Sequence, residues 1–162
     1  MSKFLSIVTI FSLFLATCKS QRNIVSRKTK EEFLKWVIEQ QPEKKIDKKL
    51  VTISLERFFK LKGDLELSKN DSIKIAEQIH SNSESYLDVN ISPNKTIISD
   101  VAKENDYLRV SNPIFFDNGK KVWIYIWHIC PDDCKNENVE IYEIDKEKYK
   151  RLSGTIIYQR GE

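Results

Sequence analysis

Four β-rich runs in the second half of the chain constrain its fold more than any other feature. Branched and aromatic side chains of the kind that fill these runs favour strands. The connection between the first two runs contains Asn118-Gly119, a dipeptide typical of a tight hairpin turn. Because strands joined by short turns pair antiparallel, the runs predict a β-meander. They cover residues 107–116, 121–130, 138–144 and 155–158.

The first half of the chain carries two helix signals. Thr29, followed three residues later by Glu32, forms a capping-box pattern before an apolar run that stops at Pro42. Ser68 and Asp71 mark the start of a second helix. The residues at helical spacing on one side of this second helix are Ile73, Ala76, Ile79 and His80. Between the two signals, the pattern of residues 50–59 predicts a strand that bends near its end.

Helices in the first half and a meander in the second half predict an α+β domain. The antiparallel sheet is expected to pack against one or two N-terminal helices on one of its faces. After the leader described below, the chain has the length of one ordinary domain, which we place at residues 29–162. The sequence has only four glycines and no glycine-rich phosphate loop.

The strand predicted at residues 121–130 is apolar on both faces. One face alternates aliphatic residues and is expected to lie in the core. The other face is aromatic, with Tyr142 placed opposite it on the next strand, and it is a candidate surface for a ligand or a partner. The alternative interpretation is an aromatic ladder that only stabilises the sheet. The aromatic residues on the strand itself are Trp123, Tyr125 and Trp127.

The charges of the chain are unevenly distributed. Every acid lies at or beyond Glu31, and from there to the C-terminus the net charge is about −3. Nucleic-acid recognition needs clustered bases on a folded face, so a nucleic-acid partner is not expected. Residues 18–28 form a basic stalk, which either rests on anionic lipid head groups or is simply solvated.

The first 17 residues have the pattern of a signal peptide. An apolar run at residues 4–16 follows Lys3 and is too short to span a bilayer. It ends at Leu15-Ala16-Thr17-Cys18, which resembles the lipobox of bacterial lipoprotein precursors. The resemblance implies that the leader is cut before Cys18 and that Cys18 carries a diacylglyceryl group, with further acylation such as palmitate at the new terminus. Ordinary signal cleavage is the alternative.

The remaining cysteines, Cys130 and Cys134, bracket the turn between two predicted strands. In an oxidising compartment such a pair is expected to form a disulfide that pins the hairpin. A redox-active pair is one alternative, although the spacing of three residues departs from the thioredoxin type. Metal binding by His128, Cys130 and Cys134 is another. We expect His128 instead to be half-buried and hydrogen-bonded in the sheet, and His80 to lie near the core.

The segment 111–115 (SNPIF), the strand after it and the C-x₃-C turn resemble uncharacterised small secreted or lipoprotein domains of Bacteroidota-type bacteria. This resemblance covers residues 107–145 and implies no activity.

The sequence contains no nucleophile elbow, zinc-protease, P-loop or dinucleotide motif. We therefore expect a lipid-anchored protein of the cell envelope, facing the periplasm. It would be a binding or structural accessory module without a cofactor, with an envelope protein or a small molecule as partner. The alternative is an envelope enzyme, redox or hydrolytic, that uses the Cys130/Cys134 turn.

Overall fold

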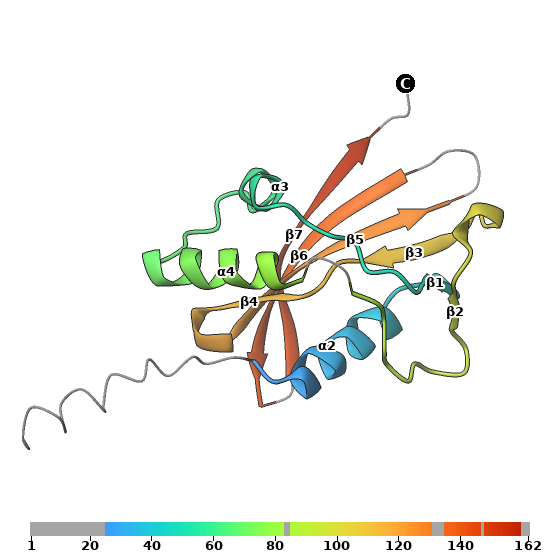
Figure 1. Cartoon of the computed structure of the whole chain (residues 1–162), viewed down its shortest axis with the longest axis horizontal. Coiled ribbons are helices and arrows are strands. Elements are labelled where there is room, and N and C mark those ends of the chain that lie inside the picture. The colour runs from blue at the N-terminus through green and yellow to red at the C-terminus, as the bar shows by residue number, and fades with distance from the viewer. Residues whose placement is uncertain (1–24, 83–84, 131–134, 147, 160–162) are drawn as a thin grey trace, which may run out of the picture.

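The computed structural model describes residues 25–82, 85–130, 135–146 and 148–159. These residues form an α+β domain, as the sequence predicted, with most of its strand pairs antiparallel (Figure 1). The elements in chain order are α2 (Arg27–Glu39), β1 (Lys45–Asp47), α3 (Leu55–Leu61), α4 (Lys69–Ser81), β2 (Thr96–Ile98), η1 (Val101–Lys103), β3 (Tyr107–Val110), β4 (Ile114–Phe116), η2 (Asp117–Gly119), β5 (Lys121–Ile129), β6 (Lys135–Asp145) and β7 (Lys148–Gln159).

The described strands form one mixed sheet in the order β2-β1-β3-β5-β6-β7, with β4 paired to β5. The predicted meander is confirmed, because β5, β6 and β7 pair antiparallel in sequence order. The last strand is longer than the predicted run at residues 155–158, since β7 already begins at Lys148. The sheet also contains a part that the sequence did not predict: β1 pairs parallel with both β2 and β3.

The run at residues 107–116 is two strands and not one. The chain leaves the ladder after Val110 and returns at Ile114, and Pro113 between them has no N–H to donate. Ser111 bridges the break, because its hydroxyl accepts a hydrogen bond from the Tyr125 amide at 3.0 Å. The predicted Asn118-Gly119 hairpin is confirmed: β4 and β5 pair antiparallel around η2, where Gly119 has φ of +82°.

Helix α2 covers one face of the sheet. It begins two residues before Thr29, because the Ser26 side chain caps it by accepting from the Thr29 amide at 3.1 Å. Phe33 is fully buried on this face, where its ring meets those of Tyr142 and Tyr149 at 5.6 and 5.2 Å. The aliphatic residues of β5 are buried here as predicted: Val122, Ile124 and Ile126.

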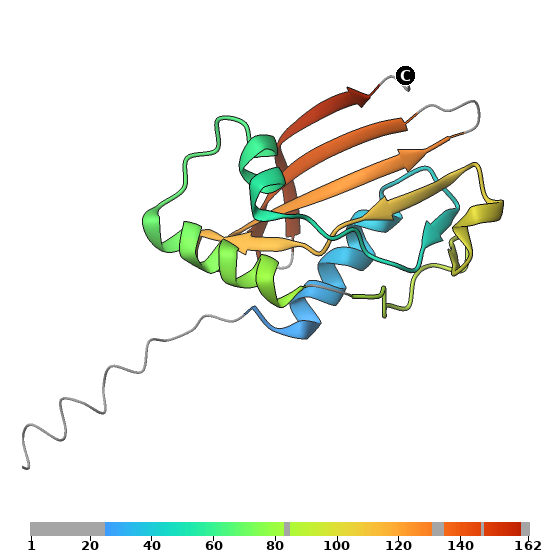
Figure 2. The ribbon, with the colours of Figure 1, turned by 45° about the horizontal axis from the view of Figure 1, so that its top comes forward.

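Helices α3 and α4 cover the opposite face, so the expectation of helices on a single face is wrong (Figure 2). The strand predicted at residues 50–59 is also wrong, because Ser54 caps α3 by accepting from the Arg57 amide at 3.1 Å. Alternating apolar residues form a strand only where a neighbouring strand can pair with them. Val51 forms just one isolated bridge, to Ser111. Phe58 of α3 is fully buried against the ring of Trp123 at 5.1 Å.

Helix α4 starts at its predicted cap, Ser68, and Ile79 packs against the core as expected, but the buried side is rotated so that Ile75 takes the place expected for Ile73. Ile75 is fully buried, whereas Ile73 is 52% exposed and His80 is exposed, which corrects the expectation that His80 lies near the core. In this orientation Gln78 faces β4, where its side chain accepts from the Phe115 amide at 2.9 Å and donates to the Phe115 carbonyl at 2.7 Å. The helix thereby supplies hydrogen-bond partners to the Phe115 N–H and C=O, on the edge of β4 that faces away from β5.

None of the helices in the described part of the chain is both long and apolar enough to cross a membrane. The leader and Cys18 lie outside the described residues.

Candidate functional site

The aromatic residues predicted to form a binding surface are mostly core residues. Trp123 and Tyr125 are fully buried, because α3 and α4 cover the face on which they lie. Tyr142 is 4% exposed and lies on the other face, since it pairs directly with Val122. These three residues therefore do not form a surface, and Trp127 alone of the four is partly exposed.

Trp127 lies where the sheet extends beyond its helical cover. The ends of β5, β6 and β7 run past α3 in Figure 1. In this region Trp127 pairs with Arg109 of β3 on one side and with Glu137 of β6 on the other. Directly paired residues point to the same face, so a base, an aromatic ring and an acid form one row across three strands.

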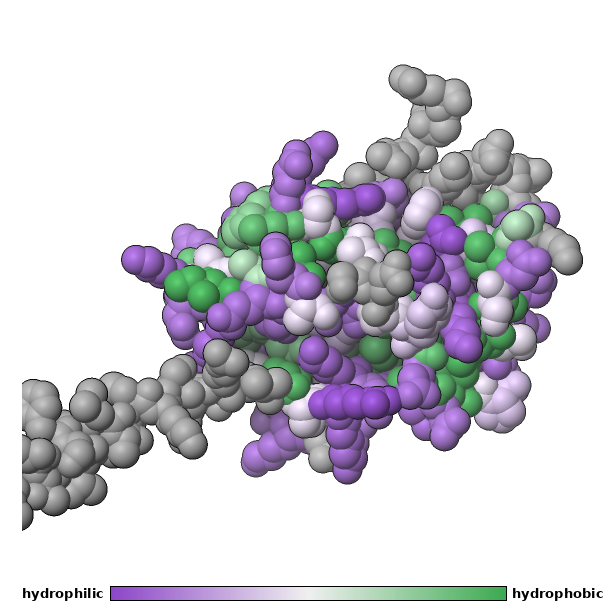
Figure 3. Space-filling model, viewed as in Figure 1, coloured by the Kyte–Doolittle hydropathy of each residue, from purple (hydrophilic) through white to green (hydrophobic). Residues whose placement is uncertain are grey.

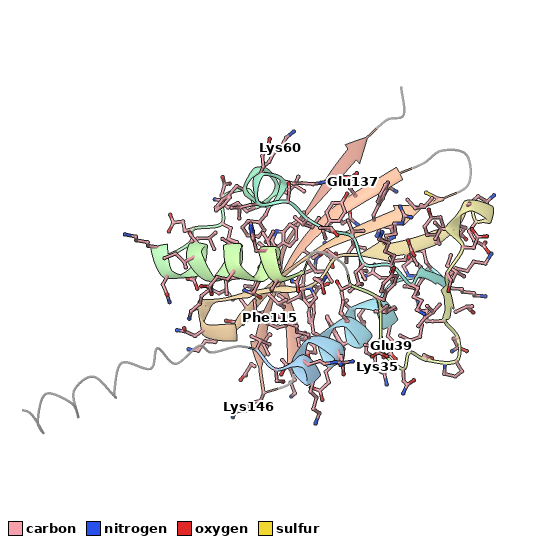
Figure 4. All side chains as sticks on the ribbon, viewed as in Figure 1. Lys35, Glu39, Lys60, Phe115, Glu137 and Lys146 are labelled. Carbon is pink, nitrogen blue, oxygen red and sulfur yellow. The ribbon has the colours of Figure 1, made fainter. Side chains whose placement is uncertain are left out.

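Arg57 of α3 closes one end of this row. Its Nη2 donates to the Tyr125 hydroxyl at 2.8 Å and to Glu137 Oε2 at 3.0 Å, and its guanidinium lies 4.9 Å from the centre of the Tyr125 ring. Figure 4 shows Glu137 beside α3. The Glu137 side chain is 4% exposed and that of Arg57 is 42% exposed. The acid is thus buried beneath a base that reaches solvent.

Burial, together with the hydrogen bond to Glu137, raises the pKa of Tyr125 well above its ordinary value of 10.0. The phenol therefore stays protonated at neutral pH and keeps its O–H on the carboxylate. Two hydrogen bonds, of which the one to Glu137 is also an ion pair, hold Arg57 in one orientation.

Arg109 is held in a similar way at the other end of the row. Its Nε donates to Asp47 Oδ2 at 2.6 Å, and the other oxygen of Asp47 accepts from the Lys49 amide at 2.8 Å. The Arg109 guanidinium lies 5.4 Å from the ring centres of both Tyr107 and Trp127. Asp47 is 5% exposed by side chain and Arg109 is 26% exposed. Each arginine is thus ion-paired with a buried carboxylate and also lies over an aromatic ring.

We call this cluster the arginine–aromatic site, made of Arg57, Arg109, Tyr107, Tyr125, Trp127, Asp47 and Glu137. Among the described residues, Arg57 donates side-chain hydrogen bonds only through Nη2 and Arg109 only through Nε. A guanidinium has five N–H donors in a fixed plane, so both side chains retain donors for a ligand. A carboxylate or a phosphate matches that geometry. Each guanidinium is already paired with one buried carboxylate, and its remaining N–H donors are the groups that can bind such an anion.

Sequence reasoning missed both arginines and both acids. Arg109 stands between the apolar Leu108 and Val110, and a base inside an apolar strand is the one local signal that marks the site. Nothing in the sequence placed Arg57 opposite Glu137, because they are 80 residues apart.

A second polar cluster surrounds His128 on the face that α2 covers. Nδ1 of His128 contacts Glu43 Oε1, and Nε2 lies 3.1 Å from the Asn138 side-chain amide nitrogen. Burial raises the pKa of Glu43, but the hydrogen bond with His128 and the charges of His128 and Lys95 outweigh it, so the pKa is lowered overall. His128 is hydrogen-bonded as expected, but it is mostly buried rather than half-buried, since only 14% of its side chain is exposed.

Both ring nitrogens of His128 have protein partners, so a metal would have to displace Glu43 or Asn138. Within the described residues, no group of three or more His, Cys, Asp or Glu side chains is arranged to hold a metal ion. Cys130 follows β5, and β6 pairs antiparallel after it, as expected for a hairpin. Cys134 lies outside the described residues, so the disulfide stays a prediction.

A small cleft lies between the end of α4 and β4. Its volume is about 10 Å³, which is room for one water molecule at most.

No protein-family model, no curated protein and no solved structure matches this chain.

Proposed function

We propose that this protein is a lipid-anchored binding module of the bacterial cell envelope, and that it binds a ligand bearing a carboxylate or a phosphate at the arginine–aromatic site. The supporting observation is the pair of guanidinium groups, each fixed by a buried carboxylate and an aromatic ring while part of it stays exposed. Arginines fixed in advance lose little conformational entropy when an anion binds.

The binding proposal is tested on the full-length protein in detergent, by its thermal unfolding in sodium phosphate, sodium acetate and sodium chloride at equal ionic strength. An oxyanion at about one hundred times its Kd stabilises the folded state by about 2.7 kcal/mol, which raises Tm by several degrees. We expect phosphate or acetate to raise Tm above the chloride value, and Arg57→Gln and Arg109→Gln to remove that difference.

Lys60→Gln is the matched control, because it makes the same change of charge on the same helix. Lys60 is exposed, and Figure 4 shows its side chain directed away from the sheet. The variant should keep the full response. A general salt effect would persist in all three variants, and that result would contradict the site.

The anchor is tested separately. The lipobox predicts that mature protein begins at Cys18 and carries acyl groups, and that Cys18→Ala either releases the protein from the membrane fraction or leaves the precursor uncut. Mass spectrometry of the mature chain decides this. A terminus at another residue without lipid would overturn the anchor without affecting the binding test.

The envelope enzyme at the Cys130/Cys134 turn remains the alternative from the sequence. A redox titration of the full-length protein separates the two functions. A structural bridge is expected below about −300 mV, and a clearly higher potential would favour a redox enzyme.

A further inference from the structure

The outer side of α3 and the second turn of α4 carry exposed apolar side chains. Leu55 is 37% exposed, Phe59 is 41% exposed and Ile73 is 52% exposed. Figure 3 shows hydrophobic surface over α3 and over the start of α4, besides other hydrophobic areas at the opposite end of the same face. We call these three residues the apolar cap. They lie on the outside of the two helices, whereas Arg57 of α3 reaches inward to the sheet.

Ile73 of the apolar cap lies on the part of α4 that is nearest to the point where the N-terminal segment joins the domain, whereas α3 lies farther away, beyond α4 (Figures 1 and 2). Val25 packs beside Gly119, in the turn between β4 and β5: its Cγ2 lies 3.5 Å from the place that a Cβ on residue 119 would occupy. The first two turns of α4 are bonded to the β4–β5 turn, because Asp71 Oδ1 accepts from the Asp117 amide at 2.9 Å and Lys74 Nζ donates to Asn118 at 3.2 Å. The start of α4, which carries Ile73, is thereby held at the end of the molecule where the stalk arrives.

The length of the stalk limits how far the domain can stand from an anchored lipid. Six residues separate Cys18 from Val25, and a fully extended chain of that length reaches only about 20 Å. Helix diameters are about 10 Å, so an anchor at Cys18 keeps Val25, and the turn that Val25 contacts, within about two helix diameters of the lipid surface.

We propose that the apolar cap docks on the lipid surface to which the protein is anchored, an inference that rests on the proposed lipid at Cys18. Amphipathic helices lie in the interface with their apolar side chains in the head-group region. The charges around the cap are of both signs, with Glu56 and Asp64 near Lys60 and Lys69. Apolar contact therefore carries the docking, and it does not need anionic lipid.

The test uses the full-length lipidated protein in phosphatidylcholine vesicles that contain brominated acyl chains, which quench a tryptophan in contact with them. Phe59→Trp adds a tryptophan in the cap at a position open enough to accept it. Lys35→Trp adds one on the exposed side of α2, which covers the opposite face of the sheet (Figure 4). We expect brominated lipid to quench Phe59→Trp more strongly than the wild type, and Lys35→Trp no more than the wild type.

Adding Leu55→Ser and Ile73→Ser to Phe59→Trp should remove the extra quenching. Both residues are exposed, so the fold should survive, which circular dichroism checks. A protein that stays with the vesicles but shows equal quenching at positions 59 and 35 overturns the docking and leaves the anchor standing. A protein without acyl mass on Cys18 overturns both. A dimer in detergent that Phe59→Ser dissociates would assign the cap to a second copy and also overturn the lipid docking.

Discussion

Trp123 offers the sharpest test of the packing, because the sequence placed it on a binding surface and the structure buries it completely. Its ring packs against Phe58 of α3 at 5.1 Å and lies among the core residues of that face. A buried tryptophan removes roughly 200 Å² from water, which at about 25 cal/mol per Å² gives an upper bound near 5 kcal/mol. Measured truncations of large aromatic core residues cost about 3–5 kcal/mol.

We therefore expect Trp123→Ala to lower the free energy of unfolding by about 3–5 kcal/mol, a large part of the 5–15 kcal/mol typical of a domain. Trp123→Phe should cost much less, about 1 kcal/mol. The indole Nε1 is buried and finds no hydrogen-bond partner among the described residues, so removing it relieves a penalty of about 1–3 kcal/mol that offsets the lost contacts.

The assay is urea unfolding followed by far-ultraviolet circular dichroism, with equal m-values required for the comparison. Phe59→Ala is the control, since Phe59 is 41% exposed and its loss should cost well under 1 kcal/mol. If Trp123→Ala left the midpoint within the range of this control, the helical cover of that sheet face would be refuted.

Three further predictions concern single interactions. Ser68→Ala should lower stability by about 1 kcal/mol in urea unfolding, because the hydroxyl caps α4 at the Asp71 amide, and an unchanged midpoint would refute the cap. Gly119→Ala should cost about 1–2 kcal/mol in the same assay, because φ of +82° strains any residue with a Cβ, and a gain in stability would contradict that conformation. The pKa of Glu43 is lowered from 4.5, so its stabilisation is present above pH 4.5 and is lost as pH falls through the lowered pKa. Glu43→Gln should lose stability less steeply than the wild type between pH 5 and pH 2, and parallel curves in that range would refute the contribution.

Local signals in the sequence determined the elements that depend on neighbouring residues. The Ser68 cap, the Asn118-Gly119 turn and the alternation in residues 121–130 each act within a few residues, and each element formed where it was predicted. The α+β class followed from their order along the chain. The strand predicted at residues 50–59 was wrong, because period-2 alternation does not decide whether a partner strand is present. In the structure Ser54 caps a helix there instead.

Tertiary structure alone decided which faces are covered and which polar side chains meet. Ile73 and Ile75 of α4 point to nearly opposite sides, and only packing against the sheet and α3, together with the bonds of Gln78 to β4, distinguishes the buried Ile75 from the exposed Ile73. The arginine–aromatic site joins Arg57 to Glu137 and Arg109 to Asp47, pairs separated by 80 and 62 residues. No local pattern encodes such contacts, because they form only when packing of the whole sheet brings distant segments together.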